Sequence, residues 1–384
     1  MKFRSFTPPL RTLLGPGPSD VHPRVREAMG RPTIGHLDPE FIRMMDEVKQ
    51  MLQYGFQTQN AMTFPVSAPG SAGMEACVAN LVEPGDKIVV CQNGVFGRRL
   101  RENVVRVGGR PVTVDDAWGE PVDPQKLEDC LKANSDAKVV AFVHAETSTG
   151  VCSDAETLAA IAHRYGCFVL MDAVTSLGGI PVRIDDWRID AVYSGSQKCL
   201  SCPPGLSPVS FSPRAVERIK SRKTLVTSWF LDLTLLMGYW GDGKRVYHHT
   251  APVNALYGLH EALLMLTEEG IEQAWARHRR NHDALREGLE AIDVSFYVKP
   301  PFRLPHLNAV TVPRGIDDAR VRERLLREYD LEIGAGLGDL VGKIFRIGLM
   351  GHSSNPKNVS YCLSALSEVL MDERRGSSSN RVLA

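Results

Sequence analysis

Short apolar runs alternate with amphipathic stretches from residue 84 onward. Each run consists mostly of apolar residues and is bounded by polar ones, a pattern typical of strands buried on both faces. The predicted strands are Asp86–Cys91, Arg110–Val114, Lys138–Val143, Cys167–Met171 and Ala191–Ser194, and the helices predicted between them are Arg98–Val107, Pro124–Ala133 and Ser153–Tyr165. This alternation predicts the α/β fold class, with a large domain built on a mainly parallel sheet flanked by helices.

Two of these helices carry start signals. Asp123 stands before Pro124, which predicts an N-cap followed by proline at the first helical position. Ser153 is followed three residues later by Glu156, which predicts a capping box with Ser153 as the N-cap. Both signals mark helix starts at positions that the apolar periodicity also favours.

The second half of the chain has a different pattern. Residues Val253–Leu289 are mostly helical in their spacing, with a break at Gly270, and short apolar runs then alternate with helices at Asp318–Glu328 and Pro356–Met371. This predicts a smaller α+β C-terminal domain. We expect an N-terminal arm at residues 1–20, a large domain at 21–268, a small domain at 269–371 and a disordered tail at 372–384.

The chain of 384 residues is electrically neutral, because 45 Lys and Arg balance 45 Asp and Glu. A neutral chain gives no electrostatic reason to expect a nucleic acid partner. No apolar run approaches the roughly eighteen residues of a transmembrane helix, and the N-terminus lacks the apolar segment of a secretory signal. We therefore expect a cytoplasmic protein that binds neither nucleic acid nor membrane.

The eight cysteines do not predict a disulfide scaffold in a chain of this length. Most have apolar neighbours, as reduced core thiols do. Cys199 and Cys202 form a C-x-x-C pair without a second pair, and Tyr247–Thr250 (YHHT) has no carboxylate or cysteine at ligand spacing. We therefore expect no metal, and a redox role of the cysteine pair stays an open alternative.

Polar residues that follow the predicted strands are the candidate site, because ligands of parallel sheets bind beyond the carboxyl ends of the strands. Lys198 lies in a Gly/Ser-rich loop after the last strand. It is either a solvated loop lysine or a Schiff-base lysine whose pKa is lowered by confinement. Asp172 ends an apolar run, where a carboxylate needs a partner. It either caps the next turn or binds a buried cation such as a pyridinium nitrogen.

Three further features are compatible with the same chemistry. Gly70 and Ser71 precede a helical run, and the amides of such a helix start bind phosphate. Phe96, just after a strand, is either a core residue or a platform for a flat ring. Arg346 lies in an apolar run and needs a partner, either a structural carboxylate or the carboxylate of a substrate.

The order of these features resembles the class V branch of fold-type I pyridoxal-phosphate aminotransferases, most closely its alanine–glyoxylate (serine–pyruvate) members. The similarity extends over nearly the whole chain, from residue 13 to residue 351. The stretches that carry it are LLGPGPS at 13–19, MDEV at 45–48, AETSTG at 145–150, SLGG at 176–179, YSGSQK at 193–198, YHHT at 247–250, AGLG at 335–338 and RIGLMG at 346–351.

The resemblance implies that pyridoxal 5'-phosphate is the cofactor. By this resemblance Lys198 forms the aldimine and later moves the proton between Cα and C4′. Asp172 hydrogen-bonds the pyridinium nitrogen. The ring lies between Val174 and Phe96, and Thr147 faces the side of its phenolic oxygen.

The resemblance also implies a phosphate site and a homodimer with active sites at the subunit interface. The residues that it assigns to the phosphate are Gly70, Ser71 and Gln197, with Tyr247 and Thr250 from the neighbouring subunit. Arg346, near Gly17, binds the substrate α-carboxylate. Residues 67–71 read SAPGS where the family commonly has SGSGH. Pro69 therefore removes a backbone donor, but we still expect a bound phosphate.

The implied activity is a ping-pong transfer of the amino group of alanine or serine to a 2-oxo acid, with glyoxylate as the expected acceptor. The alternatives are aspartate–glyoxylate, ureidoglycine–glyoxylate or pyridoxamine–pyruvate transamination on the same fold. A further alternative is a binding protein that has lost catalysis.

Overall fold

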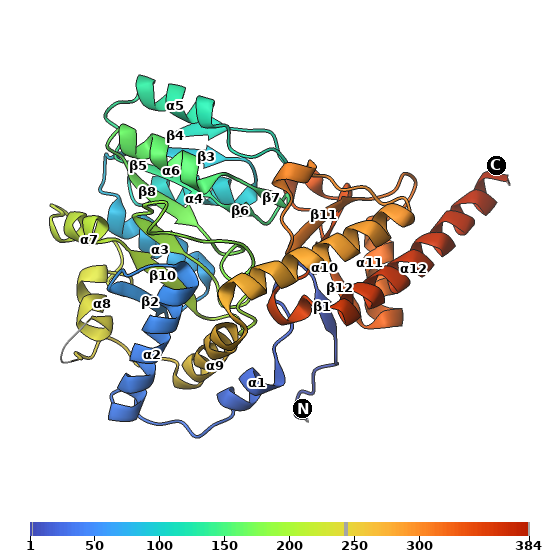
Figure 1. Ribbon diagram of the computed structural model, residues 1–384, viewed down its shortest axis with the longest axis horizontal. Coiled ribbons are helices and arrows are strands. Elements are labelled where there is room, and N and C mark those ends of the chain that lie inside the picture. Colours follow the sequence, from blue (N-terminus) through green and yellow to red (C-terminus); the bar gives the residue numbers. More distant parts are fainter. Residues whose placement is uncertain (2, 242–244, 383–384) are drawn as a thin grey trace.

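A seven-stranded sheet forms the centre of the larger lobe in the computed structural model, which describes residues 1, 3–241 and 245–382 (Figure 1). The order of its strands is β2-β10-β9-β8-β5-β3-β4. Only β10 is antiparallel to its neighbours, which confirms the mainly parallel sheet. The strands are β2 Met62–Val66, β3 Lys87–Gln92, β4 Arg110–Asp115, β5 Val139–Val143, β8 Phe168–Asp172, β9 Ala191–Tyr193 and β10 Ser207–Phe211.

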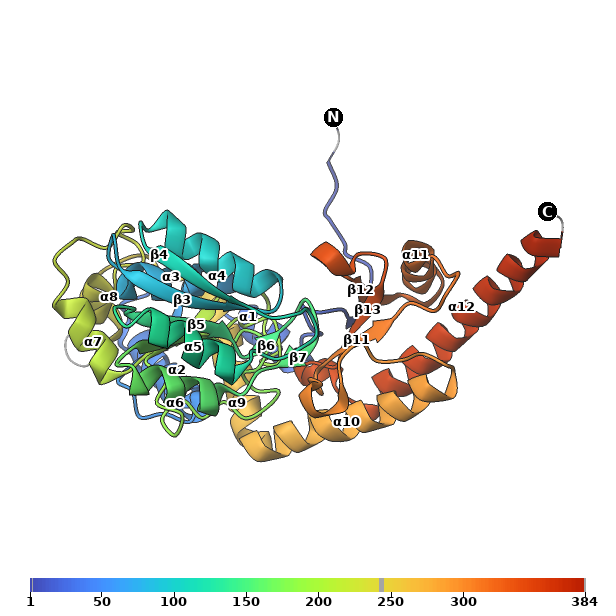
Figure 2. The ribbon, with the colours of Figure 1, turned by 90° about the horizontal axis from the view of Figure 1, so that it is seen from above.

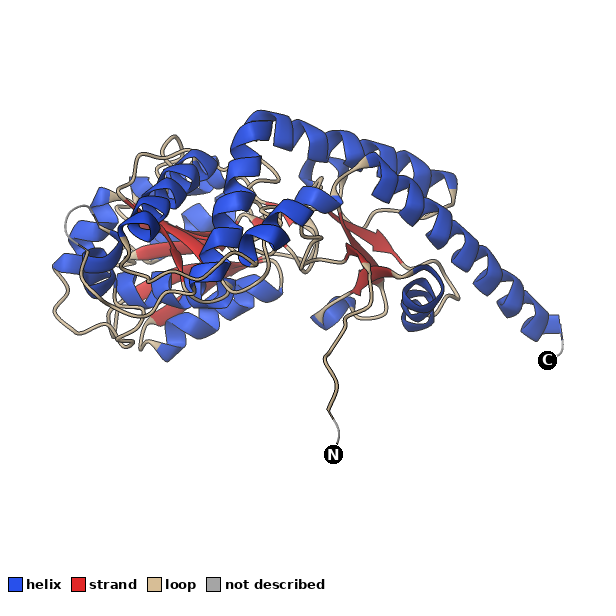
Figure 3. Ribbon diagram, turned by 90° about the horizontal axis from the view of Figure 1, so that it is seen from below, coloured by secondary structure: helices blue, strands red, loops and turns tan. Residues whose placement is uncertain are grey.

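Helices cover both faces of this sheet (Figure 3). Strand residues such as Val89, Phe142 and Leu170 are therefore buried, and they belong to one large apolar core. This arrangement explains why the strands are apolar at consecutive positions rather than at alternate ones. The helices of this lobe are α1 Pro23–Met29, α2 Pro39–Phe56, α3 Gly70–Leu81, α4 Val95–Arg106, α5 Pro124–Ala133, α6 Ala155–Arg164, α7 Pro213–Lys220, α8 Leu233–Trp240 and α9 Val253–Glu269.

The smaller lobe has a four-stranded sheet in the order β1-β12-β13-β11 and its own apolar core. Helix α10 (Ile271–Ala291) leads from the larger lobe to it, after a turn at Gly270 (Figure 2). The other elements are β1 Thr12–Leu14, β11 Leu307–Thr311, α11 Asp318–Tyr329, β12 Leu331–Ala335, β13 Ile344–Gly348 and α12 Pro356–Val382. The domain boundaries at residues 20, 268 and 371 stay predictions. The arm nevertheless contributes β1, which pairs in parallel with β12.

The two predicted helix starts have different outcomes. Asp123 caps α5 as predicted, because its carboxylate accepts hydrogen bonds from the backbone N–H groups of Gln125 and Lys126. The prediction that Ser153 is an N-cap was wrong. Asp154 is the N-cap of α6, while the buried Ser153 hydroxyl accepts a hydrogen bond from the N–H of Val122 at 3.2 Å. A contact with a distant segment therefore occupies Ser153, the residue that the local pattern favoured as the N-cap.

Helix α12 continues beyond the predicted end of the small domain, through Val382. Arg324 of α11 forms ion pairs with Asp372 at 3.1 Å and with Glu373 at 3.2 Å. These ion pairs connect the two helices at the start of the segment. The disordered tail at residues 372–384 stays a prediction.

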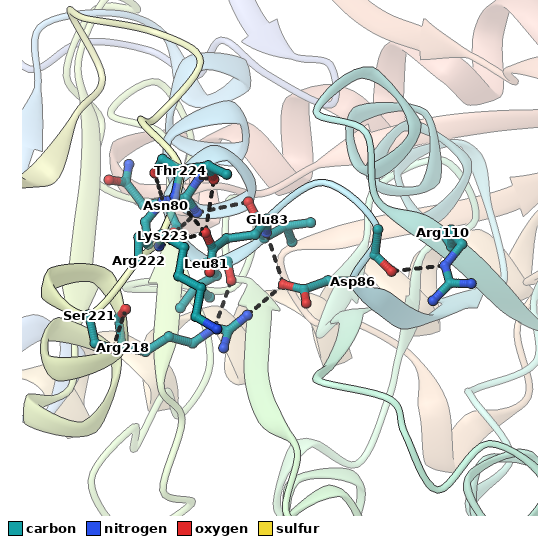
Figure 4. Close-up of polar contacts among 12 residues, drawn as sticks. Asn80, Leu81, Glu83, Asp86, Arg110, Arg218, Ser221, Arg222, Lys223 and Thr224 are labelled. Atoms are coloured by element: carbon teal, nitrogen blue, oxygen red, sulfur yellow. Dashed lines mark hydrogen bonds and ion pairs between the residues drawn. The ribbon is translucent and has the colours of Figure 1, made fainter.

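The C-terminal end of α3 is held by side chains from and just after α7 (Figure 4). Arg222 donates to the backbone oxygen of Asn80 at 2.9 Å, and Arg218 donates to that of Leu81 at 2.8 Å. Glu83 in turn accepts from the N–H groups of Lys223 and Thr224 at 2.9 Å. Cationic side chains stabilise a helix C-terminus because they pair its free carbonyl groups and face the negative end of its dipole. These contacts therefore fix the axis of α3, whose other end faces the site described next.

No helix among the described residues is long and apolar enough to cross a membrane.

Candidate active site

The predicted site residues come together at the carboxyl ends of the parallel strands, where the two lobes meet. Asp172 is the last residue of β8, and it pairs in register with Tyr193 on β9. Lys198 lies in the loop that follows β9, and Arg346 lies on β13 of the smaller lobe. The polar ends of neighbouring parallel strands meet at one sheet edge, which explains the grouping within the larger lobe.

Asp172 is 2% exposed. Its carboxylate accepts hydrogen bonds from the Tyr193 hydroxyl at 2.6 Å and from the Val174 N–H at 2.8 Å. Burial raises the pKa of Asp172 to about 7, and the two hydrogen bonds act in the opposite direction. Among the described residues, no Lys or Arg forms an ion pair with it. The carboxylate can therefore accept a hydrogen bond from a cationic ligand.

Lys198 is buried, with its amine donating to the backbone oxygen of Pro16. Burial, with a smaller contribution from the positive charge of Arg346, lowers the pKa of Lys198 to about 8. Gly17 packs directly against this side chain. A Cβ at Gly17 would lie 2.7 Å from the Lys198 amine, and its φ of +105° also favours glycine. The loop after β1 therefore confines the lysine. This confinement is what a Schiff-base lysine requires, and a solvated loop lysine would not show it.

Arg346 is 5% exposed and has no carboxylate partner among the described residues. It donates to the backbone oxygens of Ala335 at 2.7 Å and Thr147 at 3.1 Å. Burial lowers the pKa of Arg346 to about 10, so the group stays cationic at neutral pH. A buried cation held only by carbonyl groups keeps the capacity to bind an anion. Within the described part of the chain, the structural ion pair, one of the two sequence alternatives, is not present.

The start of α3 contains Gly70 and Ser71, where the sequence predicts an anion site. Gly70 is its first residue and Pro69 is its N-cap, without a side-chain hydrogen bond. The first amide groups of a helix have no partner within the helix, so those of Gly70 and Ser71 remain available. The amide oxygen of Gln197 is buried without a partner among the described residues. Because a half-turn of the amide exchanges its oxygen for a donor, Gln197 also suits an anion.

Phe96, Val174 and Thr147 surround the same region. Phe96 is half-buried at the start of α4, and the Arg99 guanidinium lies 4.9 Å from its ring centre. Val174 is half-buried and contacts the Gly70 and Gly195 backbone. Thr147 is buried, and its hydroxyl forms a hydrogen bond with that of Thr175. The sequence did not single out Thr175, because a threonine in a turn carries no specific signal.

Tyr247 and Thr250 lie on the surface of the chain. Tyr247 is 59% exposed and Thr250 is also exposed. The neighbouring histidines point inward instead. His249 forms a hydrogen bond with Ser67 at 2.8 Å, and His248 stacks on Trp229 with ring centres 4.6 Å apart. The motif is thus anchored by its histidines, while its first and last residues face outward.

Three further residues of this region were missed as candidates, although all three lay inside motifs that the resemblance quoted. Tyr193 holds Asp172, and Ser19 donates to the backbone oxygen of Lys198 at 2.8 Å. Glu146 is a fully buried carboxylate at the end of β6 (Ala145–Glu146), directly before Thr147. Strand β6 forms a small antiparallel hairpin with β7 (Val151–Cys152). The available signal for Glu146 was its position shortly after the apolar run Lys138–Val143, since polar residues that follow such strands lie at the ligand edge of a parallel sheet.

The geometry can be compared with known proteins. The family model described as aminotransferase class-V matches residues 23–348. The chain belongs to the class-V aminotransferase family. It is 42% identical to the alanine–glyoxylate aminotransferase of Rattus norvegicus, over 94% of this chain and 88% of the relative.

Two solved structures extend the comparison. An alanine–glyoxylate aminotransferase from Nostoc sp. is 44% identical with a TM-score of 0.94, over 96% of this chain and 98% of the other. A ureidoglycine–glyoxylate aminotransferase from Bacillus subtilis is 36% identical with the same TM-score of 0.94, over 97% and 95% of the two chains. This aminotransferase therefore has the fold-type I architecture predicted from its sequence.

Aminotransferases of this class depend on pyridoxal 5'-phosphate. The residues present fit that cofactor. Asp172 is a buried acceptor without a cationic partner, Lys198 is a confined amine, and Gln197 has a buried amide oxygen without a partner. Among the described residues no cluster of His, Cys, Asp and Glu could hold a metal ion.

Proposed function

We propose that this aminotransferase moves the amino group of a small L-amino acid, alanine or serine, to glyoxylate. The observation that carries the proposal is the buried Arg346 guanidinium beside Lys198, which has no carboxylate partner among the described residues. An α-carboxylate is the feature that donor and acceptor share, so one arginine serves both half-reactions. The similar proteins named alanine–glyoxylate aminotransferase support the choice of substrates.

We further propose which residues hold the cofactor. Asp172 binds the ring nitrogen, and Val174 and Phe96 lie on the two faces of the ring. Thr147 lies near its phenolic oxygen. The phosphate is bound by the amide groups of Gly70 and Ser71 and by the side chain of Gln197. When bound, pyridoxal 5'-phosphate supplies a cationic ring that accepts the electron pair from the substrate Cα.

Lys198 is proposed to attach the cofactor and to move the proton at the substrate Cα. Its pKa of about 8 leaves a fraction of the amine neutral at neutral pH, as a base requires. The backbone oxygen of Pro16 accepts a hydrogen bond from this amine, and Gly17 leaves room for it. Arg346 orients the substrate so that its Cα faces the amine. The enclosing loop after β1 excludes water from this proton.

A panel of donors and acceptors tests the proposed activity. Alanine, serine, aspartate and ureidoglycine are offered as donors with glyoxylate, and pyridoxamine is offered with pyruvate. We expect alanine or serine with glyoxylate to give the highest kcat/KM. A higher value for ureidoglycine would favour the activity named for the Bacillus subtilis structure. Absence of transamination with every pair, despite bound cofactor, would leave a binding protein.

A homodimer is the second part of the proposal. Tyr247 and Thr250 are exposed in the single chain, and Leu225, Trp229 and Val246 nearby in sequence are 90%, 64% and 61% exposed. Large exposed apolar side chains favour a partner surface. We propose that two copies cover this surface and that Tyr247 and Thr250 complete the phosphate site of the other subunit.

Subunit mixing tests this arrangement. A Lys198→Ala chain and a Tyr247→Ala/Thr250→Ala chain are each expected to have little activity. Random exchange makes half of the dimers hybrid, and each hybrid has one intact site of two. The mixture should therefore recover about a quarter of wild-type activity. No recovery, with hybrids demonstrated by mass spectrometry, would contradict the shared site.

A cytoplasmic location is the last part of the proposal. It is supported by the eight cysteines, all of which are free and most of which are buried.

A further inference from the structure

Glu146 is the most buried carboxylate near the proposed site, and none of the roles above uses it. It is 0% exposed, and no Lys or Arg among the described residues forms an ion pair with it. Its Oε1 accepts hydrogen bonds from the backbone N–H of Ser148 at 3.0 Å and from the Ser148 hydroxyl at 2.6 Å. Burying a charge in this way is costly. The position of Glu146 therefore calls for a function beyond packing.

The other carboxylate oxygen reaches a different element. Oε2 accepts from the backbone N–H groups of Phe96 at 3.2 Å and Gly97 at 3.3 Å, in the first turn of α4. The N-cap of α4 is Gly94, which has no side chain to cap the helix, and the first turn has no acidic residue. Glu146 thus supplies the cap and the negative charge that the helix lacks.

Gly94, the residue before α4, packs closely against this carboxylate and leaves no room for a side chain. A Cβ at Gly94 would lie 2.4 Å from Cγ and Cδ of Glu146. The φ of Gly94 is 176°, which any residue adopts, so backbone conformation does not require glycine here. Glycine is required because Glu146 and the Ser148 hydroxyl, which would lie 2.5 Å from that Cβ, occupy the space. The side chain and the helix start therefore fit each other closely.

The segment that carries Glu146 also contacts Arg346. The backbone oxygen of Thr147, the next residue, accepts from the Arg346 guanidinium at 3.1 Å. The negative charge of Glu146 supports the protonated form of Arg346 and partly offsets the effect of burial on its pKa. One short segment thus touches both the helix that presents Phe96 and the arginine of the smaller lobe.

We propose that Glu146 is a positioning residue that fixes the Phe96 ring and the Arg346 guanidinium relative to each other. The inference rests on the proposed function, since it assigns these two groups to the cofactor and to the substrate carboxylate. Glu146 itself contacts neither the cofactor nor the substrate. It acts through the first turn of α4 on one side and through the Thr147 carbonyl on the other.

Glu146→Gln tests the proposal because it keeps the size of the side chain while removing its charge and one acceptor. In the cofactor-free protein, we expect faster hydrogen exchange of the amides of Phe96 and Gly97. In the holoenzyme, we expect a changed circular dichroism band of the bound cofactor. KM for both the amino acid and the 2-oxo acid should rise about tenfold or more, because a small misplacement of the binding groups is enough for that loss.

Glu156→Gln is the matched control, since Glu156 is an exposed acidic residue in the first turn of α6. It should change none of these quantities. Gly94→Ala displaces the carboxylate without removing it and should reproduce the effect of Glu146→Gln. Gly30→Ala is its control, because the Cβ there meets no atom closer than 3.4 Å. If Glu146→Gln does not fold, the Gly94→Ala variant still decides the question.

A double-mutant cycle with Arg346→Lys separates positioning from general stability. If Glu146 acts through Arg346, the double variant should raise KM for the 2-oxo acid little more than Arg346→Lys alone. Unchanged exchange, dichroism and KM in both Glu146→Gln and Gly94→Ala would overturn the inference while leaving the proposed function intact. Absence of transamination in the wild-type enzyme would instead remove the proposed function, and the hydrogen exchange would still report on Glu146.

Discussion

At the scale of single residues, burial sets the chemistry of the proposed site. Asp172, Lys198 and Arg346 are all nearly inaccessible to water, and desolvation is the largest influence on the pKa of each. It raises the pKa of the acid and lowers that of both bases, so each charge is less favoured than in solution. Each group therefore gains by binding a ligand of opposite charge or, for Lys198, by losing its proton. Such shifts are common at catalytic sites.

Lys198→Ala is expected to lower turnover by at least about 1000-fold, because it removes the group that we propose to move the Cα proton. Steady-state kinetics with alanine and glyoxylate measures the loss. Borohydride reduction of the wild-type holoenzyme, followed by peptide mass spectrometry, should place the cofactor on Lys198. Lys220→Ala is a suitable control, since Lys220 is exposed on α7. Cofactor found on another lysine would contradict the assignment.

Asp172→Ala is expected to weaken cofactor binding and to lower turnover by about 100-fold or more, because it removes the carboxylate that we propose to keep the ring nitrogen protonated. Fluorescence titration of the cofactor-free variant measures the binding. Tyr193→Phe keeps the carboxylate and removes only one of its hydrogen bonds. It should therefore have a much smaller effect. Near-normal turnover in Asp172→Ala would end the proposed role of this carboxylate.

At the scale of the element, α3 links stability to the proposed phosphate site. Its N-terminus presents free amide groups, while its C-terminus is held by Arg218 and Arg222 (Figure 4). The arginines satisfy carbonyl groups that the helix itself cannot pair. Stability and ligand binding therefore depend on opposite ends of the same helix.

Arg222→Ala should lower the free energy of unfolding by about 2 kcal/mol, because it removes charged donors from the carbonyls of Asn80 and Val82. Urea unfolding of the holoenzyme measures the change. The KM values should stay near those of the wild type, since the N-terminal end of α3 is unaltered. Equal stability of Arg222→Ala and the Lys220→Ala control would show that these contacts contribute nothing.

At the scale of the whole molecule, a buried group of histidines lies where the two lobes meet. His144 and His306 come from the segments before the small hairpin and β11, and His278 comes from α10. Burial lowers the pKa of His144 to about 4 and that of His278 to about 3, and it places that of His306 well below its usual range. The Nε2 of His278 accepts a hydrogen bond from the N–H of Gly351 at 2.9 Å, which requires the neutral ring.

The holoenzyme is therefore expected to lose stability in mild acid. Unfolded histidines titrate near pH 6.5, so below that pH the unfolded chain binds more protons than the folded one. Each of the three rings should contribute a loss of about 1.4 kcal/mol between pH 7.5 and pH 5.5. Urea unfolding at a series of pH values measures this. His306→Leu should reduce the slope, and an unchanged slope would contradict the explanation.

Much of the fold was predictable because it depends on local or periodic features. The strands β3, β5, β8 and β9 are apolar on both faces, and Asp123 caps α5 through contacts with its own first turn. Lys198 and Asp172 were identified because charged residues stood out at the ends of apolar strands. The exact cap of α6 was not predictable, because the Ser153 hydroxyl is occupied by Val122 from another segment.

The sequence by itself determined the fold class, the family and the residue types of the site, because these follow from periodicity, strand ends and local motifs. Only the tertiary structure decided the partners of those residues. It brought Gly17 and Pro16 against Lys198, left Arg346 without a carboxylate partner among the described residues, and placed Glu146 under the start of α4. The physical reason is that burial and charge balance depend on segments far apart in the chain, which no local pattern encodes.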